Sequence, residues 1–436
     1  MPRAVYVLAL GIFAMVSSEF AVAGLMPEMA RGLDVSVPQI GYLITAFAAA
    51  MALGGPFMTV ALLRTRQKTA LFILFGVFLA GNVLAATADG YAVMLIARVV
   101  TGIASQAFFG VAISMTARMA APEVRGRALT VVLNGLTLGT LLGLPLSTVI
   151  GEHLGWRAAF WAVAALTVLA AVCTVFGVPA VERAETDTSF RSELAVLRRP
   201  RLLAAFVTST LIIGATFSAF SYLNPILTEV SGFGAGTVPL LLVAYGAATV
   251  VGNSAVGRLA DRHSTPVMAV GLILNVLFLT GFALLAGART PAVICVLGIG
   301  LVGVTMNPAM AVRVQRAGNT GTLVNAVHTS FITFGVMIGS SLGGVAIDGF
   351  GLRATLWLGA GLAVLGLLTL LPALLGRRGA DSHSHSHSHS HSHSESLIAA
   401  RSPAEVRGES GDGGAELPGV VVRQSSSAAA GPAGRP

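Results

Sequence analysis

Two residues of opposite charge lie inside apolar stretches of the sequence, where an ionisable side chain is costly. Glu19 falls in the first stretch and Arg98 in the fourth. A charge at the bilayer centre costs about 3 kcal/mol on insertion scales, so such residues mark proton or substrate paths by default. At about 1.5 Å of helix per residue, both lie roughly 10 Å from the same membrane surface. We predict that Glu19 and Arg98 meet and bind and release a proton, the alternative being a static ion pair between two helices.

Polar and aromatic residues in other apolar stretches are weaker candidates for lining a substrate cavity. They are Asn134, Phe217, Tyr222, Asn307 and His328. Hydrogen bonding between helices explains such polar residues equally well, and aromatic residues at helical spacing usually pack against a neighbour. His328 titrates near neutrality when unperturbed, which makes it the second candidate for a proton site.

The elements that must position these residues are twelve apolar segments. The 436 residues are 55% hydrophobic and 11% charged, less than half the charged fraction of about 25% in soluble domains. Segments of roughly 20 residues, long enough to cross a bilayer as helix, are predicted at 4–26, 41–63, 69–88, 92–117, 128–150, 157–178, 203–227, 237–257, 267–287, 291–313, 323–347 and 354–375. The sequence therefore predicts an all-α integral membrane protein and excludes an ordinary soluble enzyme.

Basic residues are unevenly divided between the two sides of the predicted helices. With the N-terminus placed in the cytoplasm, eighteen Lys and Arg residues fall on the inner side, and only Arg31, Arg157, Arg289 and Arg353 fall on the outer side. Because basic residues accumulate in cytoplasmic loops, we predict a multi-pass protein of the cell membrane with both termini cytoplasmic. The net charge of +8 then reflects membrane topology, and no nucleic-acid partner is expected.

The chain repeats itself at an offset of 196 to 198 residues. LMP at 25–27 returns as LNP at 223–225, and GWRAAFW at 155–161 returns as GLRATLW at 351–357. Six spans per copy in the same orientation predict two parallel bundles related by an axis along the membrane normal.

These observations divide the chain into four parts. We predict a first six-helix bundle at 1–178, a cytoplasmic linker at 179–202, a second bundle at 203–376 and a disordered cytoplasmic tail at 377–436. In the tail, Ser and His alternate from Ser382 to Ser394. Its composition cannot bury a core, and its histidines predict no ordered metal site.

Several motifs resemble those of a known family. LIARVVTGIASQ at 95–106 matches a fourth-helix signature, GRLADR at 257–262 matches a loop signature, and the stretches at 6–39 and 214–233 are similar to drug exporters. On these residues the chain resembles the major facilitator superfamily, in its twelve-span drug:proton antiporter branch, and more narrowly the chloramphenicol-resistance exporters of actinomycetes. The resemblance implies proton-coupled efflux of a small amphipathic drug, with chloramphenicol expected, by alternating access. It implies a monomer in the bilayer that uses drug and protons but no cofactor.

The resemblance also assigns helix packing and gating to a set of residues that match family motifs: Gly102, Gly135, Gly139, Gly143, Pro145, Asp261 and Arg262. The glycines of the fifth span form a small-residue run of the kind that lets membrane helices approach closely, and such a run is typical of exporters. The first-half loop departs from the family pattern, because Leu63 stands where the signature places an acid.

Two other functions stay open at this stage. The same fold could export or facilitate a sugar or another metabolite, although few carboxylates and few Trp residues fall in the spans. A membrane-embedded enzyme or sensor is the other alternative. The sequence contains no nucleophile elbow, HExxH metal motif or phosphate-binding loop, which favours a transporter that is not driven by nucleotide hydrolysis.

Overall fold

The structure, a computed structural model, describes residues 3–62, 65–121, 124–179, 196–234, 236–318 and 322–374. Within these ranges it contains helices and no strand. Among the described residues, twelve helices are long and apolar enough to cross a membrane, and each overlaps one of the twelve predicted spans. The all-α membrane fold is therefore confirmed.

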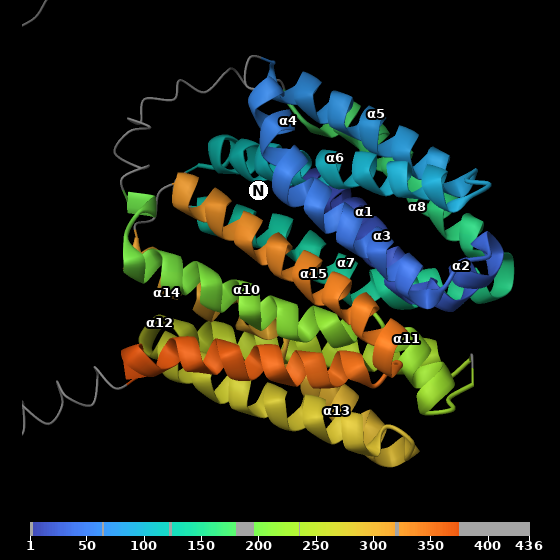
Figure 1. Cartoon of the computed structure of the whole chain (residues 1–436). Helices are drawn as coiled ribbons and strands as arrows, with labels where there is room; N and C mark the ends of the chain where they lie inside the picture. The colour runs from blue at the N-terminus through green and yellow to red at the C-terminus, as the bar shows by residue number, and fades with distance from the viewer. Residues whose placement is uncertain are drawn as a thin grey trace, which may run out of the picture. The chain divides into compact units, whose positions relative to one another are not determined.

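The first half is built from the helices whose ribbons run from blue through teal to the first green in Figure 1. These are α1 (Arg3–Gly24), α2 (Met26–Leu33), α3 (Val37–Ala49), α4 (Gly55–Leu62), α5 (Gln67–Ala86), α6 (Tyr91–Met119), α7 (Arg125–Leu154) and α8 (Trp156–Gly177). A π-helical turn, η1 (Ala50–Gly54), joins α3 to α4, so the two form one span, Val37–Leu62. The short helix α2 lies outside the spans and follows directly on α1.

The second half consists of the helices coloured green to orange. These are α10 (Pro200–Phe220), α11 (Leu223–Pro225), η3 (Ile226–Val230), α12 (Val238–Leu285), α13 (Arg289–Val302), η4 (Val304–Met306), α14 (Asn307–Ala317), α15 (Thr322–Phe350) and a last span, Ala354–Leu374. The sequence predicts a seventh span that continues to 227. Instead, α10 ends at Phe220 and the chain turns at Ser221 and Tyr222 before α11.

The two halves repeat the same packing pattern. In the first half α1 packs along α7 and α5 along α6, and in the second half α10 packs along α15 and α12 along α13. The halves meet through α3 with α15 and through α7 with α12. The repeat offset exchanges these two contacts with each other, which is the signature of two six-helix bundles related by a pseudo-two-fold axis.

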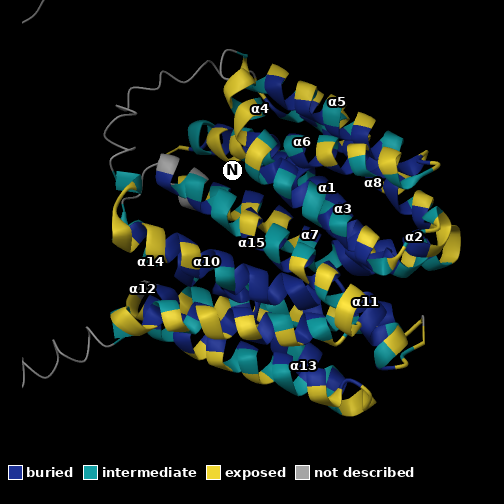
Figure 2. Cartoon of the chain, in the orientation of Figure 1, coloured by how far each residue is buried: buried dark blue, intermediate teal, exposed yellow. Residues whose placement is uncertain are grey.

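α1 and α10 are the helices most enclosed by protein. Buried residues make up 67% of the most apolar window of α1 and 72% of that of α10, against 39% for α8. Figure 2 shows α10 as largely dark blue, whereas helices at the edge carry exposed apolar side chains. A helix buried on all sides is surrounded by protein rather than lipid, so α1 and α10 lie where the two halves face each other.

The predicted loop between the eighth and ninth spans is nearly absent. α12 runs from Val238 to Leu285, and only His263 departs from helical backbone angles, three residues before Pro266. Arg262 is exposed at this break, and the side chain of Asp261 lies outside the described residues. Most of the predicted linker at 179–202 and all of the predicted tail at 377–436 also lie outside them, and α10 begins at Pro200.

Candidate functional site

A small cavity lies between the two halves, with Glu19 in its wall. The first half contributes Glu19 and Phe20 from α1 and Phe47 from α3, and the second half contributes Phe217 and Ser221 among others. Its volume is about 10 Å³, which holds about one water molecule. Two of the predicted site residues, Glu19 and Phe217, therefore share one enclosed space.

Arg98 contacts the backbone of α1 rather than the carboxylate of Glu19. Its guanidinium donates hydrogen bonds to the carbonyls of Ser18 at 2.9 Å and Glu19 at 3.2 Å. It also lies over the ring of Phe47, 4.1 Å from the ring centre, an attractive cation–π geometry. Within the described ranges no ion pair joins Glu19 to Arg98. Arg98 therefore lies beside Glu19, and the static ion pair that was the alternative to a proton site is not formed among the described residues.

Further polar contacts fix α1 to its neighbours beside Glu19. The hydroxyl of Ser18 donates to the amide oxygen of Asn82 in α5 at 2.9 Å, and the amide nitrogen of Asn82 donates to the carbonyl of Phe78 at 2.9 Å. Both side chains are fully buried. A buried amide inside an apolar stretch is a readable signal in the sequence, yet our predictions do not include Asn82.

The glycine run of α7 forms its closest contacts with α1. A Cβ atom added to Gly135 would meet the backbone of Ala9, one on Gly139 would meet Val16, and one on Gly143 would meet the backbone of Ser17. These positions recur every four residues and so lie along one face of α7, and Pro145, two residues beyond Gly143, is also buried. The glycines thus allow the two backbones to approach along their length, as the small-residue pattern predicts.

Gly102 likewise allows a close approach between helices, here on α6. A Cβ atom there would meet the carbonyl oxygen of Phe47 and the side chain of Ala50. Gly102 therefore lets α6 pack closely on α3, one turn from Arg98.

The other predicted cavity residues lie elsewhere. Asn134 is exposed on α7. His328 is buried, lies within hydrogen-bonding distance of the Ser209 hydroxyl at 3.0 Å and stacks on Phe206 with ring centres 6.1 Å apart. Asn307 begins α14, and its amide oxygen is buried without a partner in the described part of the chain. None of the three is part of the cavity wall.

Tyr222 is held in a slot between the two halves. Its ring lies where Cβ atoms on Gly41 of α3 and Gly343 of α15 would otherwise project. Its hydroxyl donates to the carbonyl of Ser340 at 2.7 Å. The prediction that Tyr222 lines the cavity is not met in this structure, because glycines on both sides enclose the ring and its hydroxyl is already bonded.

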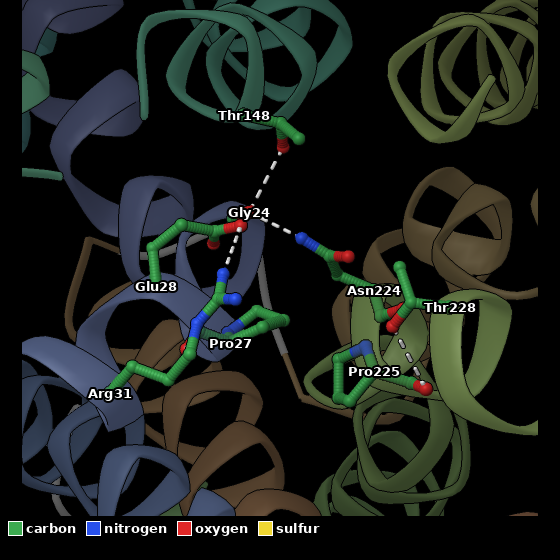
Figure 3. A network of polar contacts seen from close by, with 8 residues as sticks. All are labelled: Gly24, Pro27, Glu28, Arg31, Thr148, Asn224, Pro225 and Thr228. Atoms are coloured by element: carbon green, nitrogen blue, oxygen red, sulfur yellow. Dashed lines mark hydrogen bonds and ion pairs between the residues drawn. The ribbon is translucent and has the colours of Figure 1, made fainter. Parts of the chain in front are cut away.

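The two halves are joined at the end where α2 lies, which we call the α2 end. The carbonyl of Gly24, the last residue of α1, accepts hydrogen bonds from the hydroxyl of Thr148 in α7 and from the amide of Asn224 in α11 (Figure 3). Thr148 belongs to the first half and Asn224 to the second. Gly24 has no room for a side chain, because a Cβ atom would meet Ser147 and the carbonyl of Leu144.

A second polar contact crosses between the halves deeper in the protein. The hydroxyls of Thr45 in α3 and Ser340 in α15 lie 2.8 Å apart. Ser340 also accepts from Tyr222 through its carbonyl. Two polar contacts, at Gly24 and at Thr45, therefore hold the halves together between the cavity at Glu19 and the α2 end.

Sequence comparison finds a family and several relatives. The Major Facilitator Superfamily profile matches residues 8–329. The chain is 32% identical to the "Uncharacterized MFS-type transporter YtbD" of Bacillus subtilis (strain 168), over 84% of this chain and 94% of the relative. It is 33% identical to the inner membrane transport protein YdhP of Escherichia coli (strain K12), over 83% and 93%. It is 34% identical to a chloramphenicol resistance protein of Streptomyces lividans, over 78% and 88%.

Solved structures with the same fold are also membrane transporters. A bacterial homologue of the human lysosomal transporter Spinster, in an inward-facing and unoccupied conformation, aligns with a TM-score of 0.73 at 16% identity, over 86% of this chain and 97% of that one. The nucleoside transporter NupG aligns with a TM-score of 0.67 at 15% identity, over 85% and 98%. At such identities the likeness concerns the fold alone. With a family profile over most of the sequence and relatives above 30% identity, the chain belongs to the major facilitator superfamily of membrane transporters.

Proposed function

We propose that this protein exports a small amphipathic drug, chloramphenicol or a close analogue, in exchange for protons. The observation that carries the proposal is the position of Glu19. Its carboxyl lines the cavity between α1 and α10, where a proton and a substrate can both reach it as the halves move. An acid inside a span, facing the space between two halves, is the placement expected of a proton carrier.

Arg98 gives this site its second charge. Its guanidinium is fixed to the carbonyls of α1 at Ser18 and Glu19, so its position follows that helix. A movement of α1 relative to α6 that breaks these two hydrogen bonds would change the distance between the guanidinium and the Glu19 carboxyl. Because a nearby cation favours the charged form of an acid, such a movement would release or recapture the proton.

Transport then proceeds by alternating access between the two halves. We place the α2 end outside the cell, because the predicted outer segments are poor in Lys and Arg. The contacts of Gly24 and Thr45 with the second half close that outer end. Drug would enter from the cytoplasmic end, and parting of the α2 end would release it and let Glu19 reload from the outside.

The drug assignment rests on two supports. The Streptomyces lividans relative is a chloramphenicol resistance protein, and the cavity wall is formed mainly by aromatic and aliphatic side chains. Chloramphenicol is uncharged, so one-for-one exchange moves a net positive charge inward. Export would draw on the membrane potential as well, at about 2.3 kcal/mol per charge per 100 mV.

The test is drug uptake into inverted membrane vesicles that carry an inside-acid pH gradient. We expect uphill uptake of labelled chloramphenicol by the parent, its collapse with a protonophore, and no dependence on ATP. Glu19→Gln keeps the shape but cannot titrate, and uptake should fall to the level seen with the protonophore. Arg98→Lys keeps the positive charge but lacks the planar guanidinium with its paired N–H donors, and it should retain a fraction of uptake.

The matched control is Glu229→Gln, which removes an exposed acid outside the spans and should leave uptake unchanged. If Glu19→Gln concentrates drug as well as the parent, the proton site is elsewhere and His328 is the next residue to test. Downhill drug movement that ignores the pH gradient would instead identify a facilitator.

A further inference from the structure

Three aromatic rings from both halves surround the cavity that holds Glu19. Phe20 of α1 stacks on Phe217 of α10, with ring centres 6.3 Å apart and planes inclined by 24°. Phe220 meets Phe20 edge-on at 5.5 Å and Phe217 at 5.4 Å. These three rings, which we call the aromatic clamp, lie at the boundary between the halves. Tyr245 of α12 supports the clamp from behind, 5.2 Å from Phe220.

Ser221 brings an unsatisfied hydroxyl to the same cavity. It is 1% exposed, and within the described part of the chain its hydroxyl has no hydrogen-bond partner. By contrast, the buried hydroxyl of Ser218, in the last turn of α10, donates to the carbonyl of Ala215 at 2.9 Å. A buried hydroxyl without a partner is unfavourable, so Ser221 is free to bond a molecule that enters the cavity.

The charges around the cavity cancel each other. Glu19 is the acid in its wall, and the guanidinium of Arg98 lies over the ring of Phe47, which also lines it. A guest with a positive charge would gain from Glu19 but would be repelled by Arg98 at similar range in a weakly screened environment. The surroundings therefore favour an uncharged guest with an aromatic surface.

The cavity is too small to hold such a guest in this state. Its volume of about 10 Å³ is room for about one water, whereas an aromatic ring needs the clamp to open. Because Phe20 belongs to one half and Phe217 and Phe220 to the other, a modest separation of the halves opens a slot between flat ring faces. Offset stacking on such faces is favourable for an aromatic guest.

We propose that the aromatic clamp and Ser221 form a subsite for an uncharged aromatic ring with a polar substituent, and that the Ser221 hydroxyl bonds that substituent. The inference deepens the proposed drug export and rests on it, because it names the part of the substrate that the two halves hold between them. Ser221 is then a specificity residue, distinct from the proton site at Glu19.

The experiment is equilibrium binding of labelled chloramphenicol to the purified protein in lipid nanodiscs, without any pH gradient. Ser221→Ala should weaken binding about tenfold, the effect of one lost hydrogen bond. Ser218→Ala is the matched control, because that hydroxyl is also buried, three residues earlier in the last turn of α10, but is bonded within the helix, and it should leave binding unchanged. Phe220→Leu should weaken binding further, and the aromatic cation tetraphenylphosphonium should not compete.

The outcomes separate this subsite from the transport proposal. In vesicles, Ser221→Ala should raise the chloramphenicol concentration for half-maximal uptake and leave the dependence on the pH gradient intact. Suppose that the parent binds and transports chloramphenicol, but that Ser221→Ala and Ser218→Ala show the same affinity and the same concentration for half-maximal uptake. The proposed subsite is then contradicted, while the proposal of drug export is not. Strong competition by tetraphenylphosphonium would contradict the inference that the subsite favours an uncharged molecule. A parent that neither binds nor transports chloramphenicol contradicts the drug assignment and the subsite together.

Discussion

Glu28 shows how a single acid responds to partial burial at the protein surface. It lies in the first turn of α2, outside the spans, with one carboxylate oxygen 3.6 Å from Arg31 and the other buried without a partner in the described ranges. Desolvation raises the pKa of Glu28 above its ordinary value, and the hydrogen bond from its own backbone N–H and the attraction of Arg31 oppose that shift only in part. The charged form of this acid is therefore disfavoured by the fold.

This predicts a pH dependence of stability that Glu28→Gln removes. A raised pKa in the folded protein means that folding favours the protonated acid, so its contribution is present below pH 4.5 and is lost as the pH rises through the folded pKa. We expect the melting temperature of Glu28→Gln to exceed that of the parent more at pH 7.5 than at pH 4.5. Glu229→Gln, an exposed control, should give no such difference. A difference that grows toward acid pH would contradict this account.

The residues of the candidate site differ in how far the sequence reveals them. Glu19 stands out because an acid within an apolar run has few structural uses. Phe20 does not, since the chain has 21 Phe residues and a helix in a membrane is apolar on every side. Ser221 gives no signal either, because only the turn after α10 and the opposite half decide that its hydroxyl stays unbonded.

At the scale of the helix, the glycine run of α7 determines how closely α7 approaches α1. Gly135, Gly139 and Gly143 recur every four residues and so stay on one face of the helix. Each faces backbone or side-chain atoms of α1 at short range. In a bilayer, where no hydrophobic effect drives helices together, such close contact is a main source of association.

We predict that Gly135→Ala lowers the stability of the folded protein by disturbing this contact between α7 and α1. The added methyl group would collide with the backbone of Ala9, which cannot turn aside as a side chain can. Overpacking of this kind typically costs about 1–3 kcal/mol, so the melting temperature in detergent should fall. Gly76→Ala on α5 is the control, because a Cβ atom there meets nothing within 4 Å. Equal melting temperatures for the two variants would show that the close packing at Gly135 does not contribute to stability.

The spans themselves could be predicted from the sequence, but the interruptions within them could not. Length and hydropathy identify a span because the bilayer sets both. The π-helical turn at Ala50–Gly54 and the break between α10 and α11 leave hydropathy unchanged. They depend on backbone hydrogen bonds and on the packing of the other half, which apolar composition does not encode. The same reason explains why the predicted seventh span continued past Ser221.

At the scale of the whole transporter unit, two contacts related by the pseudo-two-fold axis connect the halves. α3 packs on α15, and α7 packs on α12 at Leu141 and Gly246. The hydroxyls of Thr45 and Ser340 meet within the first of these contacts. During alternating access, the side chains of Thr45 and Ser340 must either move apart or stay in contact while the halves rotate about them.

A disulfide between these positions tests which of the two occurs. In a background with Cys173 and Cys295 replaced, Thr45→Cys with Ser340→Cys should crosslink on oxidation, because the side chains already touch and a disulfide needs Cβ atoms about 3.5–4.5 Å apart. We expect oxidation to abolish chloramphenicol uptake in vesicles and reduction to restore it. Each single cysteine variant serves as control. Full uptake by the oxidised double variant would show that α3 and α15 stay together throughout the cycle.

The carbonyl of Gly24 has a consequence for how often the α2 end can open. A carbonyl oxygen has two lone pairs, and here one bonds within the first half and the other across to Asn224. When the halves part, Thr148 stays with Gly24, so the first half leaves no orphaned acceptor behind. Only the Asn224 amide needs a new partner, and water at the membrane surface supplies one. A carrier turns over only if neither of its states is too stable to leave, and sharing this acceptor lowers the cost of opening the α2 end at this contact.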